Sequence, residues 1–312
     1  MRARAAGLLL GFAADRLLGD PRRFHPVAGL GTTAAALERR LYADSRARGV
    51  AHSAVLVGGS VALGLVAERR LPRTLTTAAA TWAVLGGRSL EREALAVHTH
   101  LAAGDLPAAR QRLTHLVGRE TAALDKSEVA RAVVESVAEN TSDAVVAPLV
   151  WGALLGVPGL LGYRAANTLD AMVGHHNARY ERYGWASARL DDLLNLPGSR
   201  LSGLLVMASD PPNARAAAYA WRRGASAHPS PNGGVVEAAF AGALGVRLGG
   251  TNTYYGDRVE HRAVLGDGRA VRPDDIVRST VLARRTGLGA ALVAAVISLR
   301  GGWSIRRRSP LG

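Results

Sequence analysis

The feature of this sequence that most restricts its fold is a run at residues 144–163, AVVAPLVWGALLGVPGLLGY, that contains no charged side chain. About 20 apolar residues are enough for an α-helix to cross the hydrocarbon core of a bilayer. Other apolar segments cover residues 5–19, 50–67, 74–87 and 286–299, and Arg-rich blocks separate them. Basic loops between apolar segments are typical of membrane proteins. The sequence therefore predicts an all-α, polytopic integral membrane protein with polar loops between roughly four to six spans.

The charge balance is strongly basic, with a formal net charge of +14. A chain this basic can bind nucleic acid when its basic residues gather on one surface. Here the Arg residues flank apolar segments instead, so we expect no nucleic-acid partner. The absence of cysteine excludes disulfides, a thiolate nucleophile and Cys-ligated metals. The N-terminus resembles a signal peptide, but Asp15 and Arg16 interrupt its apolar part and no small-x-small cleavage site follows, so we expect a retained helix.

Residues 88–143 are predicted to form amphipathic helices. Asp105 can cap a helix whose first turn contains Pro107, and Asp125 with Glu128 fits a capping box. We therefore expect one membrane-embedded helical domain over residues 1–312, in which 88–143 form an amphipathic helical hairpin. Strand signals are weak, and the polar, Gly-rich segment 249–275 is expected to be irregular.

The second capped helix carries an acidic face. Glu135, Glu139 and Asp143 are spaced four apart, which places them on one side of an α-helix. Like charges at this spacing repel, so the face requires a counter-ion. The pattern predicts a cation site at a membrane surface. The alternative is a solvated acidic face in which Arg131 pairs with Glu135 one turn away.

A second group of oxygen-bearing side chains follows the uncharged run. Its members are Asn167, Asp170, Asp191, Asp192 and Asn195. Helical spacing brings Asn167 near Asp170 and both aspartates near Asn195. Carboxylate and carboxamide oxygens are ligands that Mg²⁺ prefers, with phosphates and water completing its shell. The two acidic groups therefore predict a Mg²⁺–phosphate site. The alternative is a set of surface carboxylates paired with arginines such as Arg164.

The segment HPSPNGG, residues 228–234, is the best candidate for binding an anion. Ser230 or Asn232 can cap the following helix, and Gly233 leaves backbone N–H groups open to a ligand at a helix N-terminus. His228 adds a donor. No Walker-type motif is present, so a nucleotide would be held in another way. The alternative is a plain Pro-rich turn.

Four long blocks in order resemble one protein family. They are DRLLGDPRRFHPVAGLG at 15–31, LVGRETAALDKSEVARAVVESVAENTSDAVVAPLVW at 116–151, YRAANTLDAMVGHHNARYERYGWASARLDDLLNLPGSRL at 163–201 and HPSPNGGVVEAAFAGALGVRLGGTNTYYG at 228–256. Together they resemble the CobD/CbiB family of cobalamin biosynthesis, the adenosylcobinamide-phosphate synthases. Glu120 stands where the family has Asp, which is a conservative departure.

The resemblance implies a multi-pass protein of the cytoplasmic membrane with its acidic helices on the cytoplasmic side. It implies a carbon–nitrogen ligase that joins (R)-1-amino-2-propanol, or its O-phosphate, to a propionate carboxyl of adenosylcobyric acid. The product would be adenosylcobinamide or its phosphate. ATP is the expected energy source and Mg²⁺ the expected cofactor. An acyl phosphate is the simplest activated form of the carboxyl group.

On this hypothesis, the predicted site residues fall into four groups. Glu135, Glu139, Asp143, Asp191 and Asp192 would hold Mg²⁺. Asn140, Asn167, Asp170 and Asn195 would support and orient the site. A phosphate would be bound by Arg164 or Arg200 together with His228, Ser230, Asn232 and Gly233. The candidates for the general base are His175, His176 and His228, because imidazole titrates near neutral pH.

Two other classes of function fit parts of the sequence. A membrane prenyltransferase also uses Asp-rich helical motifs and Mg²⁺, although it gives the HPSPN segment no role. A transporter could use Asp15 and Glu237 along a pathway, because charges within apolar segments are functional by default. The long polar blocks argue against the transporter.

Overall fold

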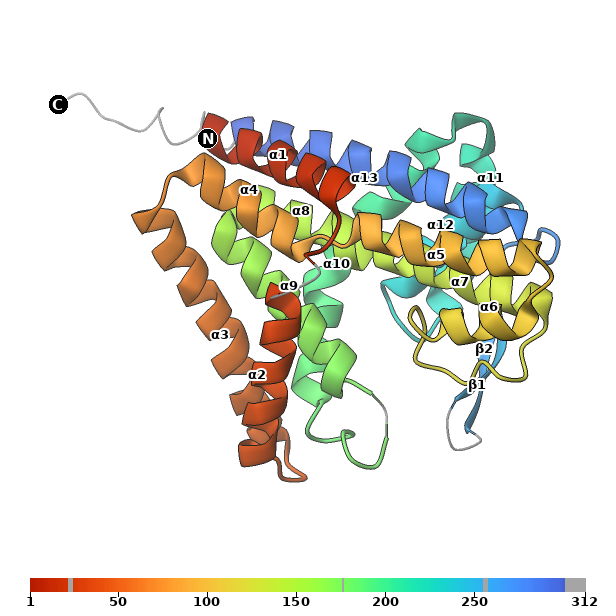
Figure 1. Cartoon of the computed structure of the whole chain (residues 1–312), viewed down its shortest axis with the longest axis horizontal. Helices are drawn as coiled ribbons and strands as arrows, with labels where there is room; N and C mark the ends of the chain where they lie inside the picture. The colour runs from red at the N-terminus through yellow and green to blue at the C-terminus, as the bar shows by residue number, and fades with distance from the viewer. Residues whose placement is uncertain (22–24, 176, 255–257, 301–312) are drawn as a thin grey trace. The chain divides into compact units, whose positions relative to one another are not determined.

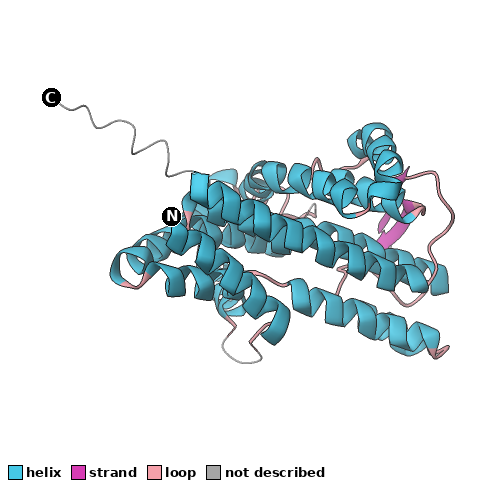
Figure 2. Ribbon diagram, turned by 90° about the horizontal axis from the view of Figure 1, so that it is seen from above, coloured by secondary structure: helices cyan, strands magenta, loops and turns pink. Residues whose placement is uncertain are grey.

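A computed structural model describes residues 1–21, 25–175, 177–254 and 258–300. For residues 252–254 and 258–261 it describes the backbone alone. Figures 1 and 2 show that these residues are mostly helical, with one small strand pair. The chain forms two compact units. The first contains Met1–Gly86, Ala147–Pro197 and the residues from Ala290 onward, and the second contains Gly87–Val146 and Gly198–Gly289.

The first unit is built from paired helices. Its complete helices are α1 (Arg2–Leu18), α2 (Pro26–Leu41), α3 (Arg46–Arg70), α4 (Arg73–Val84), α8 (Ala147–Leu155) and α9 (Val157–Val173). Helix α1 packs on α4, and α3 packs on α9. The α3–α9 contact is close because a Cβ at Gly64 would lie 2.7 Å from the backbone of Pro158. The first part of α10 (Trp185–Ser209) and the end of α13 (Asp274–Arg300) complete the unit.

The second unit has its core around α7 and α12. Besides the remaining parts of α10 and α13, this unit contains α5 (Gly87–Ala102), α6 (Leu106–Leu113), α7 (Lys126–Thr141), the π-helix η1 (Ser142–Val146), the 3₁₀ turns η2 (Pro211–Asn213) and η3 (Ala225–Ala227), α11 (Ala214–Gly224), α12 (Gly233–Leu244), β1 (Leu248–Tyr254) and β2 (Arg258–Leu265). Val133 and Val137 of α7 and Phe240 of α12 are fully buried in one apolar cluster. Alanines on both helices allow this close packing.

The helix starts predicted from capping residues are confirmed. Asp105 Oδ1 accepts a hydrogen bond from the N–H of Ala108 at 3.0 Å. Asp125 Oδ1 accepts from the N–H of Glu128, and Glu128 Oε2 accepts from the N–H of Asp125, each at 2.8 Å. This reciprocal pair satisfies backbone donors that the helix itself leaves unpaired. It fixes where α7 begins, and so fixes the register of its acidic residues.

The predicted single span over residues 144–163 is wrong. The chain passes through η1 and α8, breaks at Gly156 and continues as α9. Gly156 has φ +74°, a conformation that side chains disfavour, and Pro158 lies in the first turn of α9. Most residues of α8 are buried within the protein. Apolar composition here reflects burial in a core, which hydropathy cannot distinguish from a lipid environment.

Two helices are long and apolar enough to cross a membrane among the residues that the structure describes, namely α3 and α13. The first contains the predicted segment 50–67, and the second contains 286–299. Helix α4 has 12 residues and α1 has 17, so the apolar segments 74–87 and 5–19 lie in shorter helices. The sequence expectation of four to six spans is therefore reduced to two candidates in the described residues.

The prediction that segment 249–275 is irregular is wrong. The segment contains most of an antiparallel hairpin, in which β1 pairs with β2 with a register shift between Leu248 and Gly250. Gly249 and Gly250 have φ +80° and +92°, so glycines supply the backbone that this bulge needs. The segment 19–31 also differs from the predicted loop, because α2 begins at Pro26 after the cap His25, whose Nδ1 accepts from the N–H of Val27.

The predicted helical segment 88–143 forms α5, α6 and α7. These helices contact one another, but they do not form a compact unit on their own. The compact unit that contains them also contains residues from Gly198 to Gly289. The apolar cluster joins residues from both parts of the sequence, such as Val133 and Phe240.

Candidate functional site

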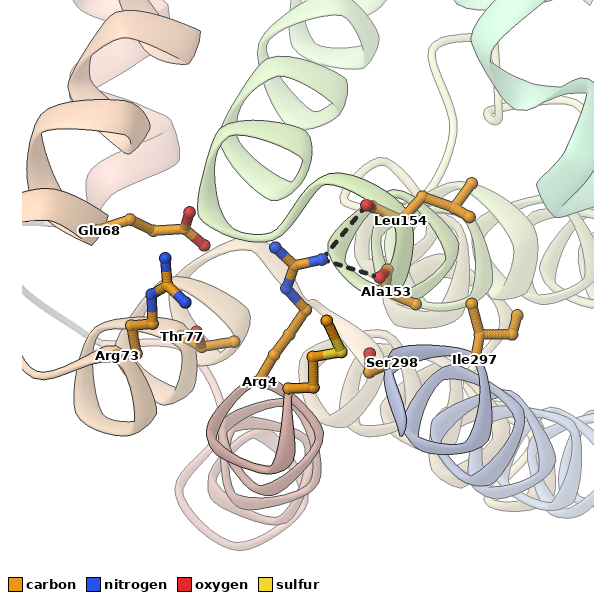
Figure 3. A pocket seen from close by; sticks show the side chains of 9 residues that line it. Arg4, Glu68, Arg73, Thr77, Ala153, Leu154, Ile297 and Ser298 are labelled. Atoms are coloured by element: carbon orange, nitrogen blue, oxygen red, sulfur yellow. Dashed lines mark hydrogen bonds between the residues drawn. The ribbon is translucent and has the colours of Figure 1, made fainter. Parts of the chain in front are cut away.

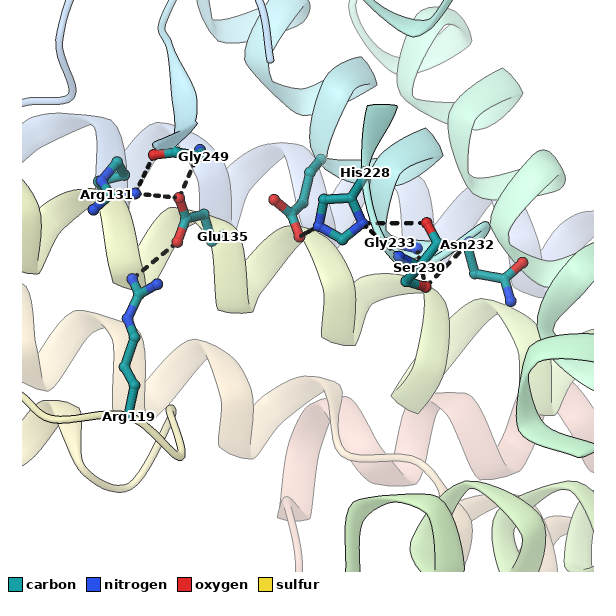
Figure 4. A network of polar contacts seen from close by, with 9 residues as sticks. Arg119, Arg131, Glu135, His228, Ser230, Asn232, Gly233 and Gly249 are labelled. Carbon is teal, nitrogen blue, oxygen red and sulfur yellow. Dashed lines mark hydrogen bonds and ion pairs between the residues drawn. The ribbon is translucent and has the colours of Figure 1, made fainter. Parts of the chain in front are cut away.

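Glu135 is the centre of a network of charge-assisted hydrogen bonds in the second unit (Figure 4). Its Oε2 accepts from Arg119 Nη2 at 2.9 Å, and its Oε1 accepts from Arg131 Nη1 at 3.1 Å. The side chain is 10% exposed, and Arg119 and Arg131 are 6% and 13% exposed. The pairing of Arg131 with Glu135, which the sequence offers as the alternative to a cation site, is present, but the pair is buried and not solvated. Two guanidinium groups neutralise the carboxylate, as a buried charge requires.

The bulge in β1 completes this network. The N–H of Gly249 donates to Glu135 Oε1 at 2.8 Å, and its carbonyl accepts from Arg131 Nη1. Arg131 also donates to the carbonyl of Thr251 at 3.1 Å. A Cβ at Gly249 would collide with the carbonyl oxygen of Ala263. The glycine therefore lets the hairpin present one donor and one acceptor to the α7 ion pair.

A buried ion pair lies between the 228–234 segment and α12. His228 Nε2 is 3.5 Å from Glu237 Oε1, and the two side chains are 3% and 2% exposed. His228 Nδ1 lies 3.1 Å from the nitrogen of Ser230 and 3.2 Å from its carbonyl oxygen. Burial lowers the pKa of His228, but Glu237 and the backbone of Ser230 outweigh that effect and raise it above its ordinary value. The imidazole thus has a backbone partner for Nδ1 in either protonation state.

Glu139 follows Glu135 by one turn of α7, and its side chain is reached by solvent. Burial among protein atoms raises its pKa first, and the carboxylates of Glu237 and Glu135 raise it further. Arg262 and His228 act in the opposite direction but do not cancel the shift. The two neighbouring carboxylates add to the rise, because they disfavour a third negative charge.

The backbone donors at the start of α12 already have partners. Ser230 Oγ accepts from the N–H of Gly233 at 3.0 Å, and the N–H groups of Gly234, Val235 and Val236 bond to the carbonyls of Ser230 and Asn232. A Cβ at Gly234 would lie 2.5 Å from His228 Cβ. The glycines therefore allow His228 to pack against α12. Phosphate binding by the backbone of Gly233 stays a prediction.

Asn232 positions a cation instead of capping α12. Its Oδ1 accepts from Arg200 Nη1 at 2.7 Å and from Ser199 Oγ at 2.8 Å. Arg200 also donates to Ser199 Oγ at 2.9 Å. Burial lowers the pKa of Arg200, and within the described part of the chain this guanidinium has no carboxylate partner. A partly buried cation held by neutral groups is well suited to an anionic ligand.

In the first unit the structure brings together three of the predicted residues. Arg164 Nη1 donates to Asn167 Oδ1 at 3.4 Å, and Asn167 Nδ2 donates to Asp191 Oδ1 at 3.3 Å. Arg164 and Asn167 come from α9 and Asp191 comes from α10. The amide of Asn167 thus bridges the Arg164 guanidinium and the Asp191 carboxylate through two hydrogen bonds.

The remaining predicted residues have varied positions. Asp143 lies in the π-helix η1, so it does not continue the regular α-helical face of Glu135 and Glu139. Asn140 donates to the carbonyl of Ser136 at 2.9 Å. Asp170, Asp192 and Asn195 lie on α9 and α10 as expected. His175 is exposed just beyond α9, and His176 lies outside the described residues.

Comparison with known proteins identifies the family. A family model described as "CobD/Cbib protein" matches residues 8–283. The chain belongs to the CobD/CbiB family. It is 48% identical to "Cobalamin biosynthesis protein CobD" of Mycobacterium tuberculosis over 305 residues, which cover 96% of this chain and 97% of that protein. The proteins of the same name from Rhodobacter capsulatus and Geobacter metallireducens are 42% and 45% identical, covering 96% and 86% of this chain and 99% and 88% of theirs. No solved structure matches.

Two features of this CobD/CbiB-family site do not follow from its sequence. Arg119 lies 16 positions from Glu135 and in no recognisable spacing with it. The sequence suggests Glu237 only as part of a transport pathway. A single polar residue inside the apolar run of α12 is the available signal, because a buried charge requires a partner. His228 supplies that partner.

The described residues of this family member do not offer a carboxylate cage for Mg²⁺. They contain no group of three His, Asp or Glu side chains arranged around a metal position. Glu135 has both oxygens engaged by guanidinium and backbone donors, so it does not fit the role of a metal ligand. Mg²⁺ needs as few as one or two protein carboxylates when phosphates and water complete its shell. Metal binding by the other predicted residues stays a prediction.

Proposed function

We propose that this protein is an enzyme of cobalamin biosynthesis that joins aminopropanol, or its O-phosphate, to a propionate carboxyl group of adenosylcobyric acid. Family membership over residues 8–283 and relatives named "Cobalamin biosynthesis protein CobD" support the pathway. The finer reaction follows from the family resemblance and from the chemistry of the second unit. We further propose that the protein resides in the cytoplasmic membrane, with α3 and α13 as spans.

The observation that carries this proposal is that the Arg200 guanidinium is a partly buried cation held by neutral groups. Both the corrinoid carboxylate and aminopropanol phosphate are anions, and the site must bind at least one of them. Nη1 of Arg200 donates to Asn232 and Ser199, whereas Nε and Nη2 make no hydrogen bond to the described residues. A planar guanidinium held in this way can bind a carboxylate or phosphate through two parallel hydrogen bonds.

The reaction needs an activated carboxyl group and a neutral amine. In the proposed scheme, a propionate oxygen attacks the γ-phosphorus of ATP, the bond to the bridging oxygen breaks and ADP leaves. The amine nitrogen then attacks the acyl carbon, the carbon–oxygen bond to phosphate breaks and phosphate leaves. Mg²⁺, when bound with ATP, would neutralise phosphate charge, and charge neutralisation of this kind is a major source of catalysis.

Glu139 is proposed to accept the proton that the amine loses. Its solvent-accessible carboxylate has a raised pKa, and a base is most effective when its pKa lies near the operating pH. The His228–Glu237 pair lies in the same electrostatic environment and would hold Glu139 near the required pKa. His228 is therefore proposed as a positioning residue, because its ring nitrogens already face Glu237 and Ser230.

The direct test uses the full chain purified in detergent. Adenosylcobyric acid, aminopropanol phosphate, ATP and Mg²⁺ are supplied, and the corrinoid is followed by mass. We expect a gain that matches amide formation and disappears without ATP. Amide formation without ATP would retain the reaction but reject the acyl phosphate. The assay is repeated with aminopropanol in place of its phosphate. No gain in mass with either amine, from protein shown to be folded, would reject the proposed function.

Two variants and a control connect this activity to the site. Glu139→Gln should reduce the rate by about 10²-fold to 10⁴-fold, as for a lost general base. Arg200→Gln should raise KM for the anionic substrate. Asp44→Asn is the control, because that carboxylate is 61% exposed and lies in the first unit. Equal activity in all three variants would remove Glu139 and Arg200 from the mechanism. Turnover of an isoprenoid diphosphate would favour the prenyltransferase alternative.

A further inference from the structure

The first unit contains a cavity of about 290 Å³ that is separate from the residues discussed so far (Figure 3). Its lining includes Arg4, Glu68, Arg73, Thr77, Ile297 and Ser298. This volume is close to the lower limit for pockets that hold small ligands. The lining combines two guanidinium groups with one carboxylate and two hydroxyl groups, so its formal charge is positive.

Two of these charged residues stabilise the break between α8 and α9. Arg4 Nη1 donates to the carbonyls of Ala153 and Leu154, each at 3.2 Å. Glu68 Oε1 accepts from the N–H of Val157 at 2.9 Å. The cation thus meets the last turn of α8 and the carboxylate meets the first turn of α9, as the helix dipoles favour. These contacts fix both side chains at the wall of the cavity.

The cavity retains polar groups that the helix ends do not use. Ser298 is 4% exposed, and its Oγ is buried without a hydrogen-bond partner. A buried hydroxyl without a partner is unfavourable, so it indicates a missing ligand atom or water. Arg4 keeps Nε and Nη2 beyond its two carbonyl contacts. Among the described residues, Arg73 has no hydrogen bond or ion pair, and Figure 3 shows it beside Glu68.

The position of the cavity indicates where its ligand comes from. Glu68 lies in the last turn of α3, and Ile297 and Ser298 lie in the last turns of α13. Within the described part of the chain, these are the two helices long and apolar enough to cross a membrane. Near the same helix ends, Val66 on α3 and Leu299 on α13 are exposed apolar side chains. Lipid phosphates occupy this level, where the apolar part of a spanning helix ends.

We propose that this cavity binds a phosphate group, and that the group belongs to the headgroup of an anionic phospholipid. Arg73 and the remaining donors of Arg4 bind its oxygens, and the Ser298 hydroxyl donates to one of them. Guanidinium groups match the geometry of phosphate oxygens. Glu68 limits the net charge of the lining, so it favours a singly charged diester over a doubly charged monoester.

The test uses the full chain in detergent and measures lipid binding by native mass spectrometry. Phosphatidylglycerol is compared with phosphatidylcholine. In a separate set of measurements, inorganic phosphate and phosphoethanolamine are tested as soluble ligands. We expect phosphatidylglycerol to bind and phosphatidylcholine to bind weakly. Arg73→Gln should weaken phosphatidylglycerol binding about tenfold, the effect of one charge-assisted hydrogen bond. Arg70→Gln is the matched control, because it removes the same charge from the end of α3 outside the lining.

The outcomes separate the ligand sources. Arg73-dependent binding of phosphatidylglycerol alone supports a lipid site. Binding of the soluble phosphates with the same Arg73 dependence supports a phosphate site but overturns its lipid source. Equal effects of Arg73→Gln and Arg70→Gln, or no effect of either, overturn the proposal. Ser298→Ala provides a second variant that removes one donor without changing charge, and it should also weaken binding.

Discussion

His228 Nε2 lies 3.5 Å from Glu237 Oε1, and the two side chains are almost completely buried. The segment 228–234 and helix α12 are joined by this ion pair. A buried imidazole would lose its proton easily without a carboxylate. Glu237 reverses that tendency, so the pair controls the charge beside Glu139. Its protonation can therefore be tested separately from any assay of activity.

Substituting Glu237→Gln should lower the pKa of His228. In the native protein the carboxylate outweighs burial and raises this pKa, whereas in the variant burial and the charge of Arg262 lower it and only the Ser230 backbone opposes them. NMR titration of the imidazole signals measures both values. The exposed His175 is an internal reference whose signal should not change between the two proteins. An unchanged His228 titration would show that Glu237 does not set its charge.

The stability of the protein should fall as pH rises from acidic values, in part because of Glu139. Its raised pKa means that the native state keeps a proton that the unfolded state loses above about pH 4.5. Stability is then lost as pH rises through the native pKa. Glu139→Gln removes this loss, so the variant should gain stability at pH 8 relative to native protein and gain little at pH 4. Thermal unfolding at both pH values measures the difference, and a constant gain at both would contradict the assignment.

Removing Arg119 should destabilise the second unit strongly. Arg119→Met leaves Glu135 with one guanidinium partner in a buried environment, and breaking a buried pair in this way costs about 3–5 kcal/mol. Arg182→Met is the control, because its pair with Asp44 is 60% and 61% exposed and should contribute at most about 1 kcal/mol. Denaturant unfolding compares the two variants. Similar small losses in both would mean that Glu135 is adequately solvated without Arg119.

Two glycines in the first unit should respond in opposite ways to alanine. Gly156 has φ +74°, and a Cβ there would collide with Glu68 and lie 2.9 Å from Arg4 Nη2. Gly156→Ala should therefore destabilise the protein by about 1–3 kcal/mol. Gly59 on α3 has no atom within 4 Å of the position that a Cβ would take, so Gly59→Ala should stabilise it by about 0.5–1 kcal/mol. The midpoint of thermal unfolding reports the sign of each change.

Helix α3 should cross the membrane. Because the chain contains no cysteine, single cysteines at Ser45 and Leu71, the caps of α3, can be labelled without background. An impermeant maleimide should label one of them in intact cells and the other only after permeabilisation. Leu71→Cys paired with Arg73→Cys is the control, because both positions lie at the same end of α3 and should label together. Labelling of Ser45→Cys and Leu71→Cys from the same side would show that α3 does not span.

The acidic face of α7 illustrates how far local sequence reasoning extends. The capping box at Asp125 and Glu128 determines where the helix starts, and the spacing of Glu135 and Glu139 then places them on adjacent turns. The pairing of Arg131 with Glu135 follows from the same periodicity. These features depend on residues at most four positions apart, so the sequence determines them directly.

Contacts between distant residues cannot be read in this way. Arg119 and the N–H of Gly249 meet Glu135 only because a loop and a hairpin pack against α7. The break at Gly156 also escapes local reasoning, since an apolar run has the same composition in a protein core and in lipid. By itself the sequence determined the caps of α6 and α7, the helical spacing that allows Arg131 to pair with Glu135, and the resemblance to the CobD/CbiB family. Only the tertiary structure decided which charges are neutralised, because burial and long-range contacts set the energy of each charged group.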